Sequence, residues 1–129
     1  MVQVNNNLKL NTYKDLIAWQ KSYQLCLKTH KIVNLFPKSE QFGLTAQLKR
    51  SALSVPSNIA EGYTRHSTQD YLRFLYIAYS SLAELETQLL LANDLGYIND
   101  AVFKDTINLQ NEVQRIMLGL IKSLKNRTL

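Results

Sequence analysis

The chain has 129 residues, 46% of them hydrophobic, which is enough for one domain with a single core and too few for two ordinary domains. Its 15 lysine and arginine residues outnumber its 10 acidic ones and give a net charge of +5, which favours anionic partners such as nucleic acid or an acidic protein surface, unless the charge serves solubility alone. The single cysteine, Cys26, excludes an internal disulfide, and the first residues lack the pattern of a signal peptide. No apolar run reaches the roughly 18 residues of a membrane span. We therefore expect a cytoplasmic protein without a membrane partner.

Residues 1–11 contain four asparagines and show no helical periodicity, so they are expected to form a flexible tail ahead of one domain at residues 12–126. The first predicted helix covers residues 14–36 and ends before Pro37, because a proline disfavours helical geometry in the residue before it. Its apolar seam, at steps of three and four residues, consists of Leu16, Trp19, Tyr23, Cys26, His30 and Val33. Because His30 lies on this seam, we interpret it as a packed, hydrogen-bonded histidine and not as a catalytic one.

The second predicted helix covers residues 40–63 and passes Pro56 without ending. Its core stripe consists of Leu44, Leu48, Ala52, Val55 and Ile59. A polar stripe lies beside the core stripe at the same helical spacing, flanked by Lys49 and Arg50, and consists of Gln47, Ser51, Ser54, Asn58, Glu61 and Arg65. Leu53 lies on the side away from the core among small side chains, so we predict that it contacts another subunit.

The third predicted helix covers residues 68–94 and starts at a cap formed by Ser67 or Thr68. Its seam consists of Tyr71, Leu75, Ala78, Leu82, Leu85, Leu89 and Ala92, and a wider apolar arc adds Leu72, Tyr76, Tyr79, Ala83 and Leu90. A helix this broadly apolar must be covered on more than one side, so Tyr76 and Tyr79 are predicted subunit contacts. Gly96 closes the helix, since glycine readily takes the left-handed conformation typical of a helix end.

The fourth predicted helix covers residues 100–125, with Val102, Leu109, Val113, Ile116 and Leu120 facing inward. Three cations near its last turn suit the negative end of the helix dipole, an explanation that competes with phosphate binding; they are Lys122, Lys125 and Arg127. No segment is predicted as a strand, and the connections between helices are short. The sequence therefore predicts an all-α fold, an antiparallel up-down-up-down four-helix bundle.

Residue spacings that would support catalysis or metal binding are absent from the sequence. His30 and His66 are far apart, and no Cys-x-x-Cys, His-x-x-x-His or Glu-x-x-His motif occurs. The glycines are isolated from one another, so no phosphate-binding loop is predicted. We expect no catalytic residues, no metal and no cofactor. An enzyme that uses Asn58, Glu61 and Arg65 is the least favoured hypothesis, because a structural ion pair or an interhelix hydrogen bond explains Glu61 more simply.

Five segments resemble the bacterial four-helix-bundle family encoded in 23S rRNA intervening sequences. They are residues 15–21 (DLIAWQK), 36–44 (FPKSEQFGL), 47–52 (QLKRSA), 55–62 (VPSNIAEG) and 81–88 (SLAELETQ), and the resemblance covers about residues 13–120. It implies assembly as a ring-shaped homo-oligomer, most often a homopentamer. The family is also similar to the accessory variability protein of diversity-generating retroelements, a basic bundle that binds nucleic acid and a reverse transcriptase. This likeness implies nucleic-acid contacts at Lys49, Arg50, Arg65 and Arg73.

Two functional hypotheses follow from the sequence. In the first, the protein is a non-enzymatic basic oligomer that binds RNA or DNA through phosphates, with low sequence specificity and a possible link to 23S rRNA intervening sequences. In the second, it is a protein-interaction scaffold that docks a partner enzyme such as a reverse transcriptase and has no direct role with nucleic acid. Charge reversal at Lys49 and Arg50 should abolish binding in the first case, and a polar residue at Leu53 should abolish it in the second.

Overall fold

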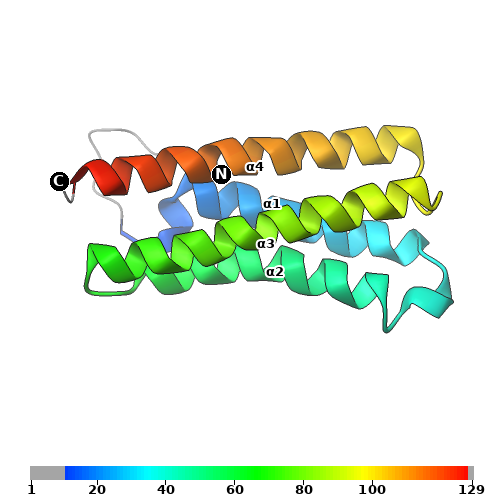
Figure 1. The fold of residues 1–129 in the computed structure, drawn as a ribbon, viewed down its shortest axis with the longest axis horizontal. Coiled ribbons are helices and arrows are strands. Elements are labelled where there is room, and N and C mark those ends of the chain that lie inside the picture. Colours follow the sequence, from blue (N-terminus) through cyan, green and yellow to red (C-terminus); the bar gives the residue numbers. More distant parts are fainter. Residues whose placement is uncertain (1–10, 128–129) are drawn as a thin grey trace.

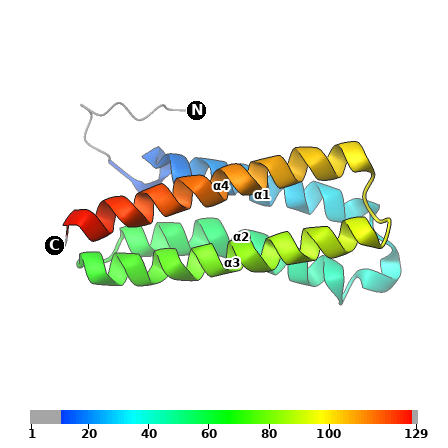
Figure 2. The ribbon, with the colours of Figure 1, turned by 45° about the horizontal axis from the view of Figure 1, so that its top comes forward.

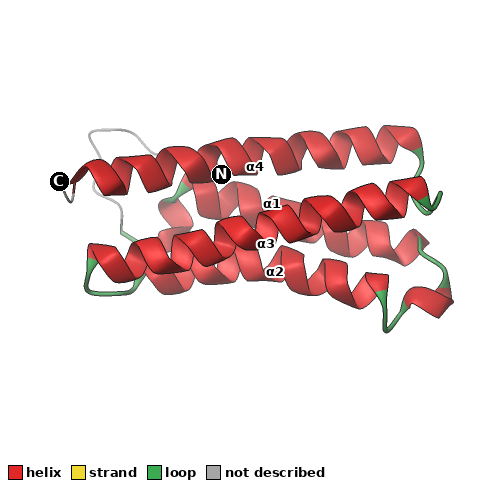
Figure 3. Ribbon diagram, in the orientation of Figure 1, coloured by secondary structure: helices red, strands yellow, loops and turns green. Residues whose placement is uncertain are grey.

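Four long helices lie side by side in the computed structural model, which describes residues 11–127 (Figure 1). They are α1 (Ile17–Ile32), α2 (Leu44–Tyr63), α3 (Thr68–Asp94) and α4 (Asp100–Arg127), accompanied by short 3-10 helices at Tyr13–Asp15, Val33–Leu35 and Lys38–Glu40. No strand occurs within residues 11–127 (Figure 3). The predicted all-α class and the number of long helices are therefore confirmed. The predicted tail lies outside the described residues except for Asn11, whose N–H donates to Asp15.

Each helix packs against two neighbours around one core. Helix α1 contacts α2 and α4, and α3 contacts the same two helices, so α1 lies diagonally across from α3. Figure 2 shows α1 and α4 on one side of the bundle and α2 and α3 on the other. The connection at residues 64–67 and the end of α4 lie at one end of the bundle, which we call the 64–67 end; the other two connections lie at the opposite end (Figure 1).

The buried stripe of α1 differs from the predicted seam. Tyr23 is 45% exposed, and Trp19 and His30 are only half-buried. The buried residues of α1 are Ala18, Gln20, Ser22, Leu25, Cys26, Thr29 and Ile32. Ser22 and Thr29 can be buried because their hydroxyls donate to the carbonyls of Trp19 at 3.0 Å and Leu25 at 2.8 Å, within the same helix. The predicted seam is correct for Leu16, Cys26 and Val33, which are buried. It is wrong for Trp19, Tyr23 and His30, because the sequence alone does not show that the hydroxyls of Ser22 and Thr29 are satisfied locally.

Two helices begin later than the sequence predicted. Helix α1 starts at Ile17, because Thr12 and Asp15 form a capping box around a separate 3-10 helix. Helix α2 starts at Leu44, after the 3-10 turn at Lys38–Glu40. The Glu40 carboxylate accepts from the Leu44 N–H at 3.2 Å and from the Tyr97 hydroxyl at 2.8 Å. It therefore caps α2 and also joins the two connections at this end of the bundle.

Helices α2 and α3 agree with prediction over most of their length. Helix α2 continues through Pro56. Helix α3 has its predicted bounds, and the Ser67 side chain accepts from the Asp70 N–H at 3.1 Å. Of the seven predicted seam residues of α3, six are buried and Tyr71 is half-buried. None of the helices within residues 11–127 combines the length and the apolar character needed to cross a bilayer.

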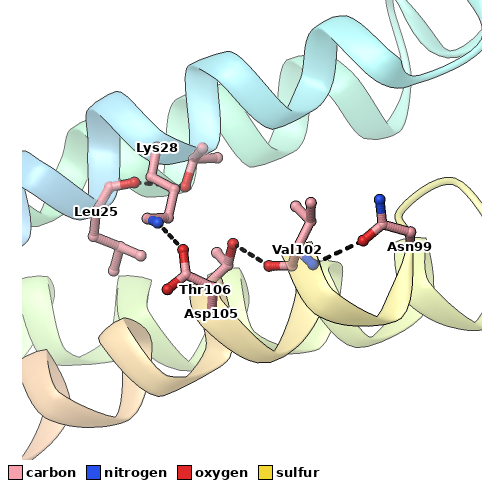
Figure 4. A network of polar contacts seen from close by, with 7 residues as sticks. Leu25, Lys28, Asn99, Val102, Asp105 and Thr106 are labelled. Atoms are coloured by element: carbon pink, nitrogen blue, oxygen red, sulfur yellow. Dashed lines mark hydrogen bonds and ion pairs between the residues drawn. The ribbon is translucent and has the colours of Figure 1, made fainter.

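Polar contacts connect α1 to α4 near the opposite end (Figure 4). The Lys28 ammonium pairs with the Asp105 carboxylate across the two helices. Just before α4, Asn99 Oδ1 accepts from the Val102 N–H at 2.8 Å. Within α4, the Thr106 hydroxyl donates to the Val102 carbonyl at 2.8 Å. The start of α4 is therefore capped, and the charge of Lys28 on α1 is neutralised by an acidic residue of α4.

Two glycines, one after the end of α3 and one inside α4, make a matched test of backbone conformation. Gly96 has φ +78°, and a Cβ there would stand free of contacts. We expect Gly96→Ala to lower the free energy of unfolding by about 1–2 kcal/mol, because a left-handed backbone is strained with a side chain. Gly119→Ala, in α4 and equally free of contacts, should raise it by roughly 0.5–1 kcal/mol. Urea denaturation of both variants measures the two changes. Equal changes in the free energy of unfolding would contradict a left-handed backbone at Gly96.

Candidate nucleic-acid interface

The four basic residues singled out in the sequence fall into two separate groups. Lys49 and Arg50 are exposed in the first half of α2, and neither side chain has a hydrogen bond or ion pair within residues 11–127. Arg65 lies in the connection between α2 and α3, and Arg73 lies in the second turn of α3. At ~1.5 Å of rise per residue, the end of α2 next to Arg65 is about 20 Å from Arg50 along the helix axis. One chain therefore does not bring all four cations into a single patch.

Arg65 and Arg73 share one aromatic ring. The Cζ atom of Arg65 lies 4.6 Å from the centroid of the Phe74 ring, and that of Arg73 lies 4.7 Å from it. Phe74 itself is only 6% exposed. Cation–π contacts of this kind contribute about 0.5–1 kcal/mol at exposed sites. The buried ring therefore supports two guanidinium groups at the 64–67 end.

Gly62 allows α2 and α3 to approach closely enough for this arrangement. A Cβ at position 62 would stand 2.8 Å from Phe74 Cβ and 3.0 Å from the Tyr71 ring. Real Cβ atoms do not tolerate such a distance, so only glycine fits here without movement of a helix. Gly62 lies inside the last turn of α2 and is buried.

The carboxylates beside the two arginines bind them weakly. Arg65 and Glu61 lie 3.8 Å apart, and Arg73 and Asp70 lie 3.9 Å apart. All four side chains are between 42% and 61% exposed. Exposed ion pairs of this length contribute roughly 0–1 kcal/mol and are screened by salt. A phosphate group can therefore replace either carboxylate at little cost.

The last turn of α4 adds further positive charge at the same end. The Lys125 ammonium lies 5.4 Å from the centroid of the Tyr76 ring. The positive charge of Arg127 lowers the pKa of Tyr71, although burial dominates and raises that pKa to about 12. Tyr71 also packs edge-on against Tyr63, with ring centroids 6.1 Å apart. Aromatic side chains of α3 thus underlie cations from the 64–67 connection, α3 and α4.

The Tyr71 hydroxyl is buried and has no hydrogen-bond partner among residues 11–127, which gives a pH-dependent prediction. The pKa of Tyr71 is about 12 in the folded protein against about 10 in an unfolded chain. Between these values the unfolded state releases the proton first, so the free energy of unfolding falls as pH rises above about 10. Tyr71→Phe should be neutral or stabilising at pH 7 and should reduce this loss. Urea titrations of the wild type and the variant at neutral and alkaline pH measure this loss. If the variant lost as much stability at alkaline pH as the wild type, the raised pKa of Tyr71 would not be its cause.

A shallow groove begins at these cations and follows the outer surface of α3. Its volume is about 760 Å³, and it is lined by residues of α3 from Gln69 to Glu84. Arg73 and Asp70 lie at one end of the groove, and Tyr76 and Ile77 form an apolar middle section. The groove is open to solvent on its long side, so it provides an elongated surface and not an enclosed reaction chamber.

The polar stripe of α2 is used mainly for packing between helices. The hydroxyls of Ser54 and Ser81 lie 2.8 Å apart and join α2 to α3. The Asn58 amide donates to the Ser54 carbonyl at 2.8 Å and to the Ser54 hydroxyl at 2.9 Å. Glu61 contacts Arg65, as the simpler interpretation expected. Asn58 and Glu61 therefore have structural contacts that explain their presence without catalysis.

The predicted subunit contacts differ in exposure. Leu53 is 55% exposed on α2 and Tyr76 is 42% exposed on α3, whereas Tyr79 is partly buried against the core. Helix α1 presents an apolar group that the sequence reasoning missed, namely Ile17, Tyr23 and Leu27, each 44–49% exposed. A correct core stripe for α1 would have revealed this group, since these residues fall outside it.

Comparisons with known proteins agree with the geometry of the bundle. The family model for the 23S rRNA-intervening sequence protein matches residues 14–119. A crystal structure from Bacteroides thetaiotaomicron is similar with a TM-score of 0.74 and 25% sequence identity, over 82% of this chain and 99% of that one. It is described as a protein with unknown function from the S23 ribosomal protein family. No curated protein matches the chain.

Proposed function

The chain belongs to the family of 23S rRNA-intervening sequence proteins, and we propose that it is a non-enzymatic basic oligomer that binds RNA or DNA through phosphates. The observation that carries the proposal is the pair of guanidinium groups over Phe74, held near carboxylates only by contacts of 3.8 and 3.9 Å. The proposed contacts to phosphate are Lys49, Arg50, Arg65 and Arg73. The family name makes structured ribosomal RNA the first nucleic acid to try.

Low sequence specificity follows from where the aromatic rings lie. Reading single-stranded bases requires exposed rings on which bases stack. Phe74 is buried and Tyr71 is half-buried, while Tyr76 has an ammonium group over its ring. These rings hold cations and fill the space between helices, so the surface contacts the sugar–phosphate backbone. Binding of this kind depends strongly on salt.

Assembly into a ring is the second part of the proposal. Because α1 and α3 lie diagonally across the bundle from each other, their outward surfaces lie on different sides of the bundle. Apolar side chains are exposed on both: Tyr23 and Leu27 on α1, Tyr76 and Ile77 on α3. Joining one surface to the other is a head-to-tail contact, which closes into a ring when the rotation allows it. The number five, a homopentamer, is the form that the family resemblance implies. The up-down-up-down order of the bundle follows from the short connections between helices.

A ring would repeat the basic groups. One chain carries a net charge of +5, and each added copy multiplies the number of phosphate contacts that can form at once. Several weak contacts then act together, with the effective concentration set by the spacing of the copies. Oligomerisation is therefore the means by which two modest cation groups become a nucleic-acid binding surface.

The scaffold hypothesis is the second candidate, and exposed apolar residues at the opposite end of the bundle favour it. Phe42 is 91% exposed, Leu35 is 61% exposed and Leu95 is 50% exposed. A partner protein, for instance an enzyme, that docks there would bury them. Such binding would survive charge reversal at Lys49 and Arg50 and would fail when Phe42 or Leu53 is made polar.

One experiment separates the two functions. Purified protein is titrated into a mixed-sequence RNA hairpin and a DNA duplex at low salt, and the native mass of the free protein is measured on the same sample. We expect a ring-sized oligomer that binds both polymers. An oligomer that binds neither at low salt would remove the nucleic-acid function and leave the scaffold.

A further inference from the structure

We propose that nucleic acid binds chiefly at the 64–67 end of the bundle, where Arg65, Arg73, Lys125 and Arg127 form one phosphate-contacting surface. The inference rests on the proposed function and adds two residues of α4 to it. It also assigns the main contact to an end of the bundle, and not to the side of α2 that carries Lys49 and Arg50.

The geometry behind this inference is a short stretch of α3. Residues 71 to 76 hold three aromatic rings, and each ring lies near cations. Arg65 and Arg73 lie over Phe74 at 4.6 and 4.7 Å, and Lys125 lies over Tyr76 at 5.4 Å. Arg127 is near enough to Tyr71 for its charge to act on that hydroxyl. Cations from the 64–67 connection, α3 and α4 therefore converge on about one and a half turns of α3.

Helix dipoles do not account for all of these cations. Lys125 and Arg127 lie in the last turn of α4, where a positive charge is favoured. Arg73, however, lies near the beginning of α3, where the positive end of that helix gives a cation no stabilisation. Its position over Phe74, beside Arg65, is therefore not explained by the helix dipole and is consistent with a ligand of negative charge.

Three lysines elsewhere on the bundle have closer carboxylate partners than Arg65 and Arg73 do. Lys104 pairs with Asp100 at 3.0 Å, and Lys28 pairs with Asp105. On the flank between α1 and α4, Lys21 pairs with Glu112 at 3.4 Å. At the 64–67 end the carboxylate contacts of Arg65 and Arg73 are the longer ones, 3.8 and 3.9 Å. An incoming phosphate therefore meets less competition from carboxylates at Arg65 and Arg73 than at these three lysines.

The test compares two variants in which the same number of charges is removed. Lys125→Gln with Arg127→Gln changes the 64–67 end. The control, Lys31→Gln with Lys38→Gln, changes two exposed lysines at the opposite end, one of which also lies in the last turn of a helix. Both proteins are titrated into the same mixed-sequence RNA hairpin over a salt series. We expect about tenfold weaker binding for the first variant and a salt slope reduced by about one for each cation that no longer binds a phosphate.

The control should bind within about twofold of the wild type. Lys125→Arg with Arg127→Lys should restore binding, which separates the charge from any packing role. Glu61→Gln, which frees Arg65 from its carboxylate, should tighten binding several-fold. Equal weakening of the 64–67 variant and the control, or no weakening of either, overturns the inference while the proposed function stands. Absence of binding by the wild type overturns both.

Discussion

Reversing Lys49, Arg50, Arg65 and Arg73 to glutamate together should weaken binding to a mixed-sequence RNA hairpin by on the order of 10²–10³-fold near physiological salt. Each cation that binds a phosphate releases a counterion on binding, so its removal lowers both the affinity and the slope of log affinity against log salt. The four side chains are exposed, so the fold should survive. Fluorescence anisotropy gives the affinity, and circular dichroism checks the helical content.

A control with the same change in charge decides whether position matters. Lys31, Lys38, Lys104 and Arg115 are also exposed, and none of them belongs to the proposed surface. Reversing these four to glutamate should cost much less affinity than reversing the proposed four. Equal reductions would mean that RNA responds only to net charge. Retained binding after reversal of the proposed four would eliminate the assignment altogether.

The second large effect is expected from Gly62→Ala. The new Cβ would stand 2.8 Å from Phe74 Cβ and 3.2 Å from the Tyr71 carbonyl oxygen. Neither atom is the mobile end of a side chain, so a helix must shift, and overpacking of this kind costs about 1–3 kcal/mol. We expect a lower free energy of unfolding by that amount in urea denaturation. A shift of α2 away from α3 should also move Arg65 relative to the Phe74 ring and weaken RNA binding.

Gly119→Ala provides the reference for this variant. Both glycines lie in helices, but the Cβ at position 119 meets no atom within 4 Å, so alanine there gains only its helix propensity. If Gly62→Ala were as stable as Gly119→Ala, the close approach of α2 and α3 at residue 62 would be wrong, and so would its role in placing the two arginines.

The sequence predicted the fold well where each turn of a helix repeats the same pattern. Helix α3 holds a regular apolar seam over seven positions, and its bounds agree with the structure. Helix α1 shows the limit of this reasoning. Its core stripe contains Ser22 and Thr29, whose hydroxyls bind backbone carbonyls of the same helix. Their polarity favoured a neighbouring stripe, because side chain to backbone hydrogen bonds are not visible in a periodicity.

The candidate site was predicted only as separate basic residues. Arg65 and Arg73 were named, but the ring between them was not, because Phe74 lies outside the regular seam. The approach of α2 to α3 depends on the absence of one methyl group at Gly62, which no periodicity reveals. Likewise Glu40 and Tyr97 are joined by a hydrogen bond across 57 positions, a contact that only the folded chain defines.

The salt dependence of RNA binding by the wild-type protein tests the central claim most directly. The affinity for a mixed-sequence RNA hairpin is measured between about 50 and 200 mM salt, a range over which phosphate-mediated binding weakens steeply. We predict a linear fall of log affinity with log salt, with a slope of several units, and a similar result for a second hairpin of unrelated sequence. An affinity that does not change with salt, or that differs strongly between the two hairpins, would contradict binding through phosphates.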